Sequence, residues 1–296
     1  PMRTRRRFIL GSATGVALLA LTAWAQVLDL PPRAPNALSG SEFARRVAML
    51  DLGERDREVY AQVMAGNVPD FLRRLCPVPA RSVVEGRINS GTYYVTPDYL
   101  AVGSDDDYFL APISPYNAQR IAEALHCTLP TPKMVNQIFF AAEVKLAPAP
   151  IPPSAAMTTV PVFRQHNDLV RAQRAEQLPA HPLGALVAGH KKDVVLTARL
   201  AANPGKVAIY GWHRTNGLPI QPLYLKHSAA WVDCSQCVRL VQQKMVANET
   251  ARTVAEVLAD PALAGLLSDE GPLAAVRYPT NAPLALQTLT NQASVN

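Results

Sequence analysis

Residues 190–239 hold the side-chain types that hydrolytic and nucleophilic chemistry require. The candidate residues are His190, His213, His227, Asp233, Cys237 and Arg239. They lie at the ends of apolar segments or on the loops between them, where polar groups usually assemble into sites. We interpret His227 as a base or ligand and Asp233 as its orienting group or a second ligand. His190 and His213 are expected to support them, and Arg239 to bind an anion.

One chemistry that fits is nucleophilic, with Cys237 as a thiolate, His227 or His213 as base and Asp233 as orienter. The segment Ser235-Gln236-Cys237-Val238-Arg239-Leu240 resembles the L,D-transpeptidase signature, Ser-His-Gly-Cys-Ile/Val-Arg-Leu. The match covers the last four positions, Cys237 to Leu240. Ser235 and Gln236 do not supply its His-Gly, and one residue is missing. The resemblance therefore implies a nucleophile at Cys237 without its usual histidine neighbour.

A second chemistry is metal-assisted hydrolysis, for which zinc is the candidate cofactor. The spacing His227-x5-Asp233 resembles the His-x6-Asp spacing of zinc D-Ala-D-Ala peptidases, one residue short. Two histidines and an aspartate would suit Zn²⁺ with an open water position. A zinc-thiolate site would instead use Cys234 and Cys237 with two of the histidines.

The chain has four cysteines, and in an exported protein pairing is the default expectation. Of the three possible connectivities we favour Cys76–Cys127 together with Cys234–Cys237. The Cys-x-x-Cys pair also fits a reactive dithiol, so a structural and a redox interpretation both stay open.

Other segments resemble a group of exported bacterial proteins of no settled activity. These are residues 94–100 with 103–107, residues 129–134 and the block 206–241. That group carries Asp-Tyr-Ser-His-Gly-Val-Arg-Leu in the last block, where this chain has Cys234, Gln236 and Cys237 in place of Tyr, His and Gly. If that histidine is catalytic in the group, the resemblance implies a lost or altered activity here.

Residues 1–25 are typical of an export signal: a basic head, a short apolar run and the small-x-small exit Ala23-Trp24-Ala25. Thr4-Arg5-Arg6-Arg7-Phe8-Ile9 resembles the twin-arginine class of signals. The resemblance implies contact with the twin-arginine export machinery during transit. We therefore expect a periplasmic or extracellular location.

The charge balance argues against nucleic acid as a partner. The chain has 29 Lys+Arg and 23 Asp+Glu, but four of the arginines lie in the signal, which leaves 25 basic against 23 acidic residues. Such a balance is not the basic surface that nucleic acid needs. No segment after residue 25 has the uninterrupted apolar length of a membrane span. An envelope polymer or a small ligand is the expected partner.

The patterning predicts an α+β fold with N-terminal helices, antiparallel sheet segments and C-terminal helices. We expect a linker over 26–40 and one globular domain over 41–296, with a Pro-rich strap at 146–161. Ser41 is expected to cap a first helix that has Phe43, Val47 and Leu50 on one face. Further helices are expected over 54–65, 69–75, 117–127, 132–144, 162–178, 249–259 and 261–268. Strands are expected as a three-stranded meander over 91–113, and over 193–199 and 206–212. Asp105-Asp106-Asp107 fits a turn in the meander or a Ca²⁺ site.

Together these features predict an exported hydrolase that acts on a cell-envelope or extracellular polymer, with its site in 190–239. The alternative is a non-catalytic periplasmic ligand-binding or structural protein in which Cys234–Cys237 staples a loop.

Overall fold

The computed structural model describes residues 26–280, and most helices in this range begin at a capping side chain. Ser39 and Asp51 cap the first two helices, each with a glutamate three residues on that bonds back to the cap N–H. The helices are α1 (Gly40–Arg46), α2 (Leu52–Met64), α3 (Pro115–Ala124), α4 (Pro132–Ala141), α5 (Val160–Gln177) and α6 (Val254–Ala259). Within the described range, none of them is both long and apolar enough to span a bilayer.

The strands form four sheets, and the mixed content of helix and antiparallel strand confirms the predicted α+β class. The larger sheets run β14-β13-β2-β12-β5, with β1 also on β2, and β10-β9-β8-β11; β3-β4 and β6-β7 are two-stranded. The strands are β1 (Cys76–Val84), β2 (Arg87–Val95), β3 (Ala101–Gly103), β4 (Tyr108–Leu110), β5 (Cys127–Thr128), β6 (Val144–Lys145), β7 (Val187–Ala188), β8 (Lys192–Val194), β9 (Ile209–His213), β10 (Pro219–Tyr224), β11 (Gln236–Cys237), β12 (Val241–Gln242), β13 (Lys244–Ala247) and β14 (Thr250–Thr253).

The prediction of a three-stranded meander is wrong, because β2 pairs with β1, β12 and β13 and not with β3. It forms a long hairpin with β1 through the turn Glu85-Gly86, in which both residues have positive φ. Strand β1 carries Pro77 and Pro79, which a sheet tolerates here because β1 pairs only with β2. Strands β3 and β4 instead form a separate pair.

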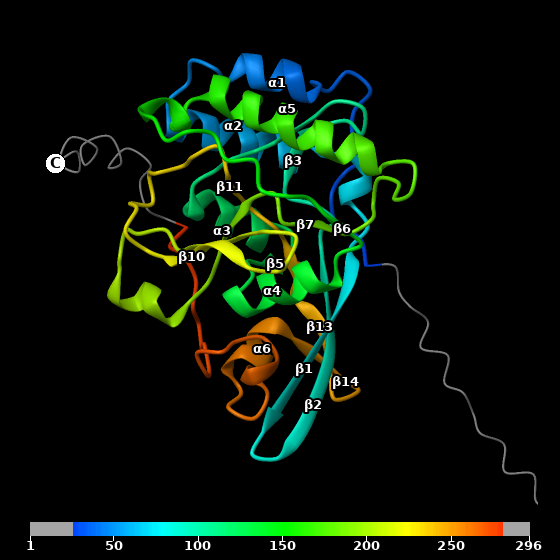
Figure 1. The fold of residues 1–296 in the computed structure, drawn as a ribbon, viewed down its shortest axis with the longest axis vertical. Helices are drawn as coiled ribbons and strands as arrows, with labels where there is room; N and C mark the ends of the chain where they lie inside the picture. The colour runs from blue at the N-terminus through cyan, green and yellow to red at the C-terminus, as the bar shows by residue number, and fades with distance from the viewer. Residues whose placement is uncertain (1–25, 281–296) are drawn as a thin grey trace, which may run out of the picture.

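Helices α1, α2 and α5 gather at one end of the molecule, and the long hairpins lie at the other end. Figure 1 shows α1, α2 and α5 together near the β3–β4 pair, while α6 lies beside the β1–β2 and β13–β14 hairpins. One apolar core fills the first end, around Phe43, Phe109 and Phe163. A second core lies under α4 and α6, around Val78, Tyr93 and Met134. The four-stranded sheet lies between these ends.

The expected helices near residue 260 are shorter in the structure. Residues 250–253 form β14, so α6 begins only at Val254, and a 3₁₀ turn over Ala264–Leu266 replaces the helix predicted for 261–268. Likewise, the helix expected over 69–75 is a 3₁₀ turn at Asp70–Leu72.

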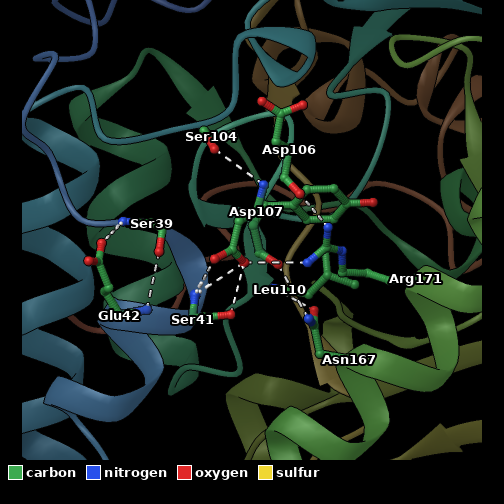
Figure 2. A network of polar contacts seen from close by, with 10 residues as sticks. Ser39, Ser41, Glu42, Ser104, Asp106, Asp107, Leu110, Asn167 and Arg171 are labelled. Carbon is green, nitrogen blue, oxygen red and sulfur yellow. Dashed lines mark hydrogen bonds and ion pairs between the residues drawn. The ribbon is translucent and has the colours of Figure 1, made fainter.

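The Asp105-Asp106-Asp107 turn is tied into the fold by protein groups, which does not suit the Ca²⁺ interpretation. Asp107 accepts from the Ser41 backbone N–H at 3.2 Å and from its hydroxyl at 3.1 Å, and pairs with Arg171 at 3.3 Å (Figure 2). Asp105 Oδ1 accepts from the Phe71 N–H at 3.2 Å. Ser41, the expected helix cap, therefore joins α1 to this turn, and the cap itself is Ser39.

Both ends of the described range are hydrogen-bonded to backbone groups that lie far away in the sequence. Leu28 is buried, and its backbone N–H donates to the Arg73 carbonyl at 2.8 Å. At the other end of the described range, the Tyr278 hydroxyl accepts from the Ala208 N–H at 2.9 Å and donates to the Val195 carbonyl at 2.8 Å. Tyr278 is itself buried, so it links backbone groups that follow β8 and precede β9.

Candidate functional site

The four-stranded sheet brings the predicted site segments side by side. Strand β8 is antiparallel to β9 and parallel to β11. Its residue Lys192 lies opposite Gly211 on β9 and Gln236 on β11, and Asp193 lies opposite Cys237. The pairing of β8 with β11 therefore places Lys192 and Asp193 beside the Asp233–Arg239 segment.

At the edge of this sheet, Lys192 and Asp233 form a nearly buried ion pair. Lys192 Nζ lies 2.6 Å from Asp233 Oδ2. Asp233 Oδ1 accepts from the Ser235 N–H at 2.9 Å and from the Ser235 hydroxyl at 2.7 Å. Burial alone would raise the pKa of Asp233, but the ammonium and these hydrogen bonds more than offset it and hold the pKa below its ordinary value. Asp233 is thus a carboxylate at neutral pH.

Three aromatic side chains lead from this pair toward the surface. Trp231 Nε1 donates to Asp233 Oδ2 at 3.4 Å. The His227 ring stacks on the Trp231 ring with centroids 4.9 Å apart, and the Tyr224 ring also lies 4.9 Å from the His227 ring, tilted by 58°. These three aromatic residues are partly exposed. Burial and the positive charge of Lys192 lower the pKa of His227, which favours the neutral imidazole. We call Lys192, Asp233, Trp231 and His227 the outer cluster.

The backbone beside the outer cluster is strained. Trp212 has φ of 55°, a conformation that bulky residues rarely adopt and that costs on the order of 1–3 kcal/mol. Its N–H donates to the Lys191 carbonyl at 3.0 Å, and its ring lies 5.8 Å from Lys192 Nζ. The strained residue therefore forms part of the surroundings of the lysine.

Behind the outer cluster lies a second, fully buried set of polar groups. His190 Nε2 lies 3.0 Å from Asp98 Oδ1, and the Tyr99 hydroxyl donates to Asp193 Oδ2 at 2.8 Å. Burial is the main reason that the pKa of Asp193 rises to about 7. Carboxyl groups with such shifts concentrate at functional sites, although structural networks also produce them.

Arg239 belongs to this buried set, and its contacts do not suit the anion clamp expected from the sequence. Its guanidinium donates to the carbonyls of Thr96 and Val187, both at 2.6 Å, and lies 4.5 Å from the Tyr99 ring centroid. Only 1% of the residue is exposed. The guanidinium thus joins two backbone segments inside the protein.

A buried amine lies on the α5 side of the same strand. Lys191 Nζ lies 2.9 Å from His166 Nδ1 and donates to the Cys234 carbonyl at 2.7 Å. Burial lowers the pKa of both Lys191 and His166. The lysine therefore fixes the backbone at Cys234 without a carboxylate partner in its hydrogen bonds.

Cys237 is placed as a core residue, which does not suit the predicted nucleophile. It is fully buried on β11, and burial raises the pKa of its thiol to about 12. Reactive thiolates require the opposite shift. Among the hydrogen bonds of the described residues, none joins Cys237 to a histidine.

All four cysteines are free thiols, so neither of the predicted disulfides is present in the structure. The order of the strands explains why Cys76 and Cys127 are not bonded to each other. Strands β2 and β12 lie between β1, which carries Cys76, and β5, which carries Cys127. Three strand spacings of about 4.8 Å far exceed the Cα separation of about 7 Å that a disulfide can bridge.

His213 lies away from the outer cluster. Its Nε2 is 2.8 Å from Asn136 Oδ1, and its ring stacks on Phe139 with centroids 4.7 Å apart. Burial lowers its pKa to about 4. Its contacts come from α4 and from Tyr210 on β9, whereas those of His227 come from Tyr224 on β10 and from Trp231, so the two histidines have no contact residue in common.

The candidate residues therefore fall into three places: His227 and Asp233 in the outer cluster, His190, Cys237 and Arg239 in the buried set, and His213 beside α4. Within residues 26–280, His, Cys, Asp and Glu side chains do not gather in any group of three or more that could hold a metal ion. The two predicted zinc sites are thus not assembled in this part of the chain.

Sequence reasoning missed Lys192 and Trp231 as site residues. A signal for Lys192 was present: Lys191-Lys192-Asp193 leads directly into Val194-Val195-Leu196, so three ionisable residues adjoin a segment apolar enough to be buried. Buried charges are costly unless they are paired, and this placement predicts partners for each of them.

Comparisons with models of protein families, with curated proteins and with solved structures find no match to this chain.

Proposed function

We propose that the chain is an exported hydrolase that cleaves an amide or ester bond in a cell-envelope or extracellular polymer, with its chemistry in the outer cluster. In this proposal the neutral imidazole of His227 takes a proton from the attacking water and returns it to the leaving group. The Lys192 ammonium stabilises the oxyanion that forms on the carbonyl. Asp233 holds Lys192 in place.

The observation that carries this proposal is a neutral, partly exposed imidazole next to a nearly buried ion pair. A base must be unprotonated at working pH, and the lowered pKa of His227 meets that need. Positive charge in a site shielded from water stabilises a developing oxyanion more strongly than the same charge in solvent. The 2.6 Å contact of Lys192 with Asp233 leaves its other ammonium protons for such a role.

The same cluster disfavours cleavage of a glycosidic bond. Most glycosidases use two carboxyl groups, one of them protonated. The outer cluster contains one carboxyl group, Asp233, and its pKa is lowered. Hydrolysis of an acyl bond requires only the base and the oxyanion-stabilising group.

The test is hydrolysis of peptidoglycan and of ester-bearing envelope polymers, followed by detection of the newly formed amino, carboxyl or hydroxyl groups. His227→Gln is expected to lower the rate at least about 100-fold, since general-base catalysis contributes about 10² to 10⁴. His181→Gln is the control, because His181 is partly exposed and only approaches Glu143, at 4.0 Å. Full activity in the His227→Gln variant would contradict the proposal.

One observation favours the non-catalytic alternative, an envelope protein that binds its ligand without turnover. The Trp231 and Tyr224 rings each lie 4.9 Å from the His227 ring, and these contacts limit the approach of a reacting group. In that case the polymer binds without being cleaved, and His227→Gln changes affinity alone. Equilibrium binding to the same polymers, measured beside the hydrolysis assay, separates the two functions.

A further inference from the structure

A small internal cavity lies between α4 and the four-stranded sheet. Its polar lining comes from Tyr99, Asp193, His213 and Arg239, and its apolar lining includes Val135 of α4. The volume is about 10 Å³. A cavity needs roughly 10–15 Å³ of this kind to hold one water molecule, so only a ligand of that size fits.

One carboxyl oxygen of Asp193, a residue that lines the cavity, lacks a hydrogen bond. Asp193 is 2% exposed, and its Oδ2 accepts from Tyr99 at 2.8 Å. Its Oδ1 is buried and has no hydrogen-bond partner among residues 26–280. An unsatisfied buried polar group costs about 1–3 kcal/mol, and more when it is charged. In native proteins nearly all buried polar groups have a protein or water partner, and an ordered water is one explanation for a group without a protein partner.

The charges around the cavity select a neutral ligand. The Asp193 carboxylate disfavours an anion, and the Arg239 guanidinium on the same lining disfavours a cation. A water molecule carries no charge, donates to a carboxylate and accepts from a carboxylic acid. Because the pKa of Asp193 is about 7, both forms of the carboxyl group occur near neutral pH, and water can serve either.

We propose that this cavity is a binding site for a single internal water molecule that hydrogen-bonds Asp193 Oδ1. The site is separate from the outer cluster, and it does not depend on whether the chain is a hydrolase. The water satisfies the carboxyl group that lies opposite Cys237 in the sheet. Asp193 is therefore a hydrated residue within the core.

Oxygen-17 magnetic relaxation dispersion, which counts long-lived internal waters, tests this proposal. Val135→Ile adds one methylene to the wall of the cavity and leaves too little room for water. Val170→Ile is the matched control, because Val170 is buried on α5 in the core around Phe43, Phe109 and Phe163 and does not line this cavity. We expect the Val135→Ile variant to hold one long-lived water fewer than the wild type, and the control to hold the wild-type number.

An unchanged count in a folded Val135→Ile variant would overturn the proposal. A high-resolution crystal structure of the wild-type chain tests it without any substitution. A solvent peak within about 3.2 Å of Asp193 Oδ1 is expected, and a cavity without such a peak would also overturn it.

Discussion

Asp193→Asn should change the pH dependence of folding stability in a defined window. The pKa of Asp193 rises from 3.8 to about 7 in the folded protein, chiefly because of burial, although Arg239 and Tyr99 act in the opposite direction. The folded protein therefore binds a proton more tightly than the unfolded chain. The stabilising effect of this proton is full below pH 3.8 and is lost as the pH rises through about 7.

The size of the effect follows from the shift. Each unit of pKa corresponds to about 1.4 kcal/mol, so the free energy of unfolding loses about 4 kcal/mol from this group between pH 4 and pH 7. Asparagine does not ionise, and its carbonyl can still accept from Tyr99. The variant therefore avoids this loss and should gain about 1.4 kcal/mol per pH unit relative to the wild type between about pH 4 and pH 7, with no further gain above that window.

Urea denaturation of both proteins at half-unit steps from pH 4.5 to 8.5 measures the difference. All other titrating groups are common to both proteins and cancel to a first approximation. Asp168→Asn, at an exposed position of α5, controls for the loss of a carboxylate at the surface. If the free-energy difference between wild type and Asp193→Asn stayed constant across this range, our account of Asp193 would be refuted.

Further predictions concern the ion pair, a helix cap and the thiols. Lys192→Met leaves Asp233 buried without its partner and should lower the free energy of unfolding by about 3–5 kcal/mol at pH 7, measured by urea denaturation; a loss below 1 kcal/mol would mean that the pair is exposed to solvent. Ser114 caps α3, and its hydroxyl donates to the buried Asp56 carboxylate. Ser114→Ala should therefore lower the free energy of unfolding by about 1–3 kcal/mol, and an unchanged free energy would argue against that contact. Titration with a thiol reagent should detect only Cys76 rapidly in the native protein and all four cysteines in denaturant, because the other three are buried; only two thiols in denaturant would indicate a disulfide.

Local signals in the sequence predict much of the helical structure but little of the strand pairing. Pro115 and Pro132 stand at the first helical position after a Ser or Thr cap, and this pattern is readable without a structure. The Asn216-Gly217 turn between β9 and β10 is equally local. By contrast, β2 pairs with β12 and β13, about 150 residues later in the chain, and no local pattern specifies that choice.

The candidate site was only partly predictable for the same reason. The sequence predicts that His227 and Asp233 lie close, since only a short loop separates them. The role of Arg239 could not be predicted, because its acceptors are the backbone carbonyls of Thr96 and Val187. Every residue has such a carbonyl, so the residue types in the sequence do not identify these acceptors. The position of Lys192 opposite Gln236 depends on a parallel pairing of β8 with β11, which no turn between them specifies.

The contacts of Tyr278 constrain the order in which the protein can reach its native state. This side chain accepts from the Ala208 N–H and donates to the Val195 carbonyl, two buried groups that lie at the ends of β8 and β9. Until residue 278 has been synthesised, this part of the sheet lacks those partners, so a nascent chain that ends before it cannot complete the native core. The native outer cluster is therefore expected to form only after synthesis has passed this tyrosine, and ribosome-bound chains truncated before residue 278 should be sensitive to proteases around residues 195–208.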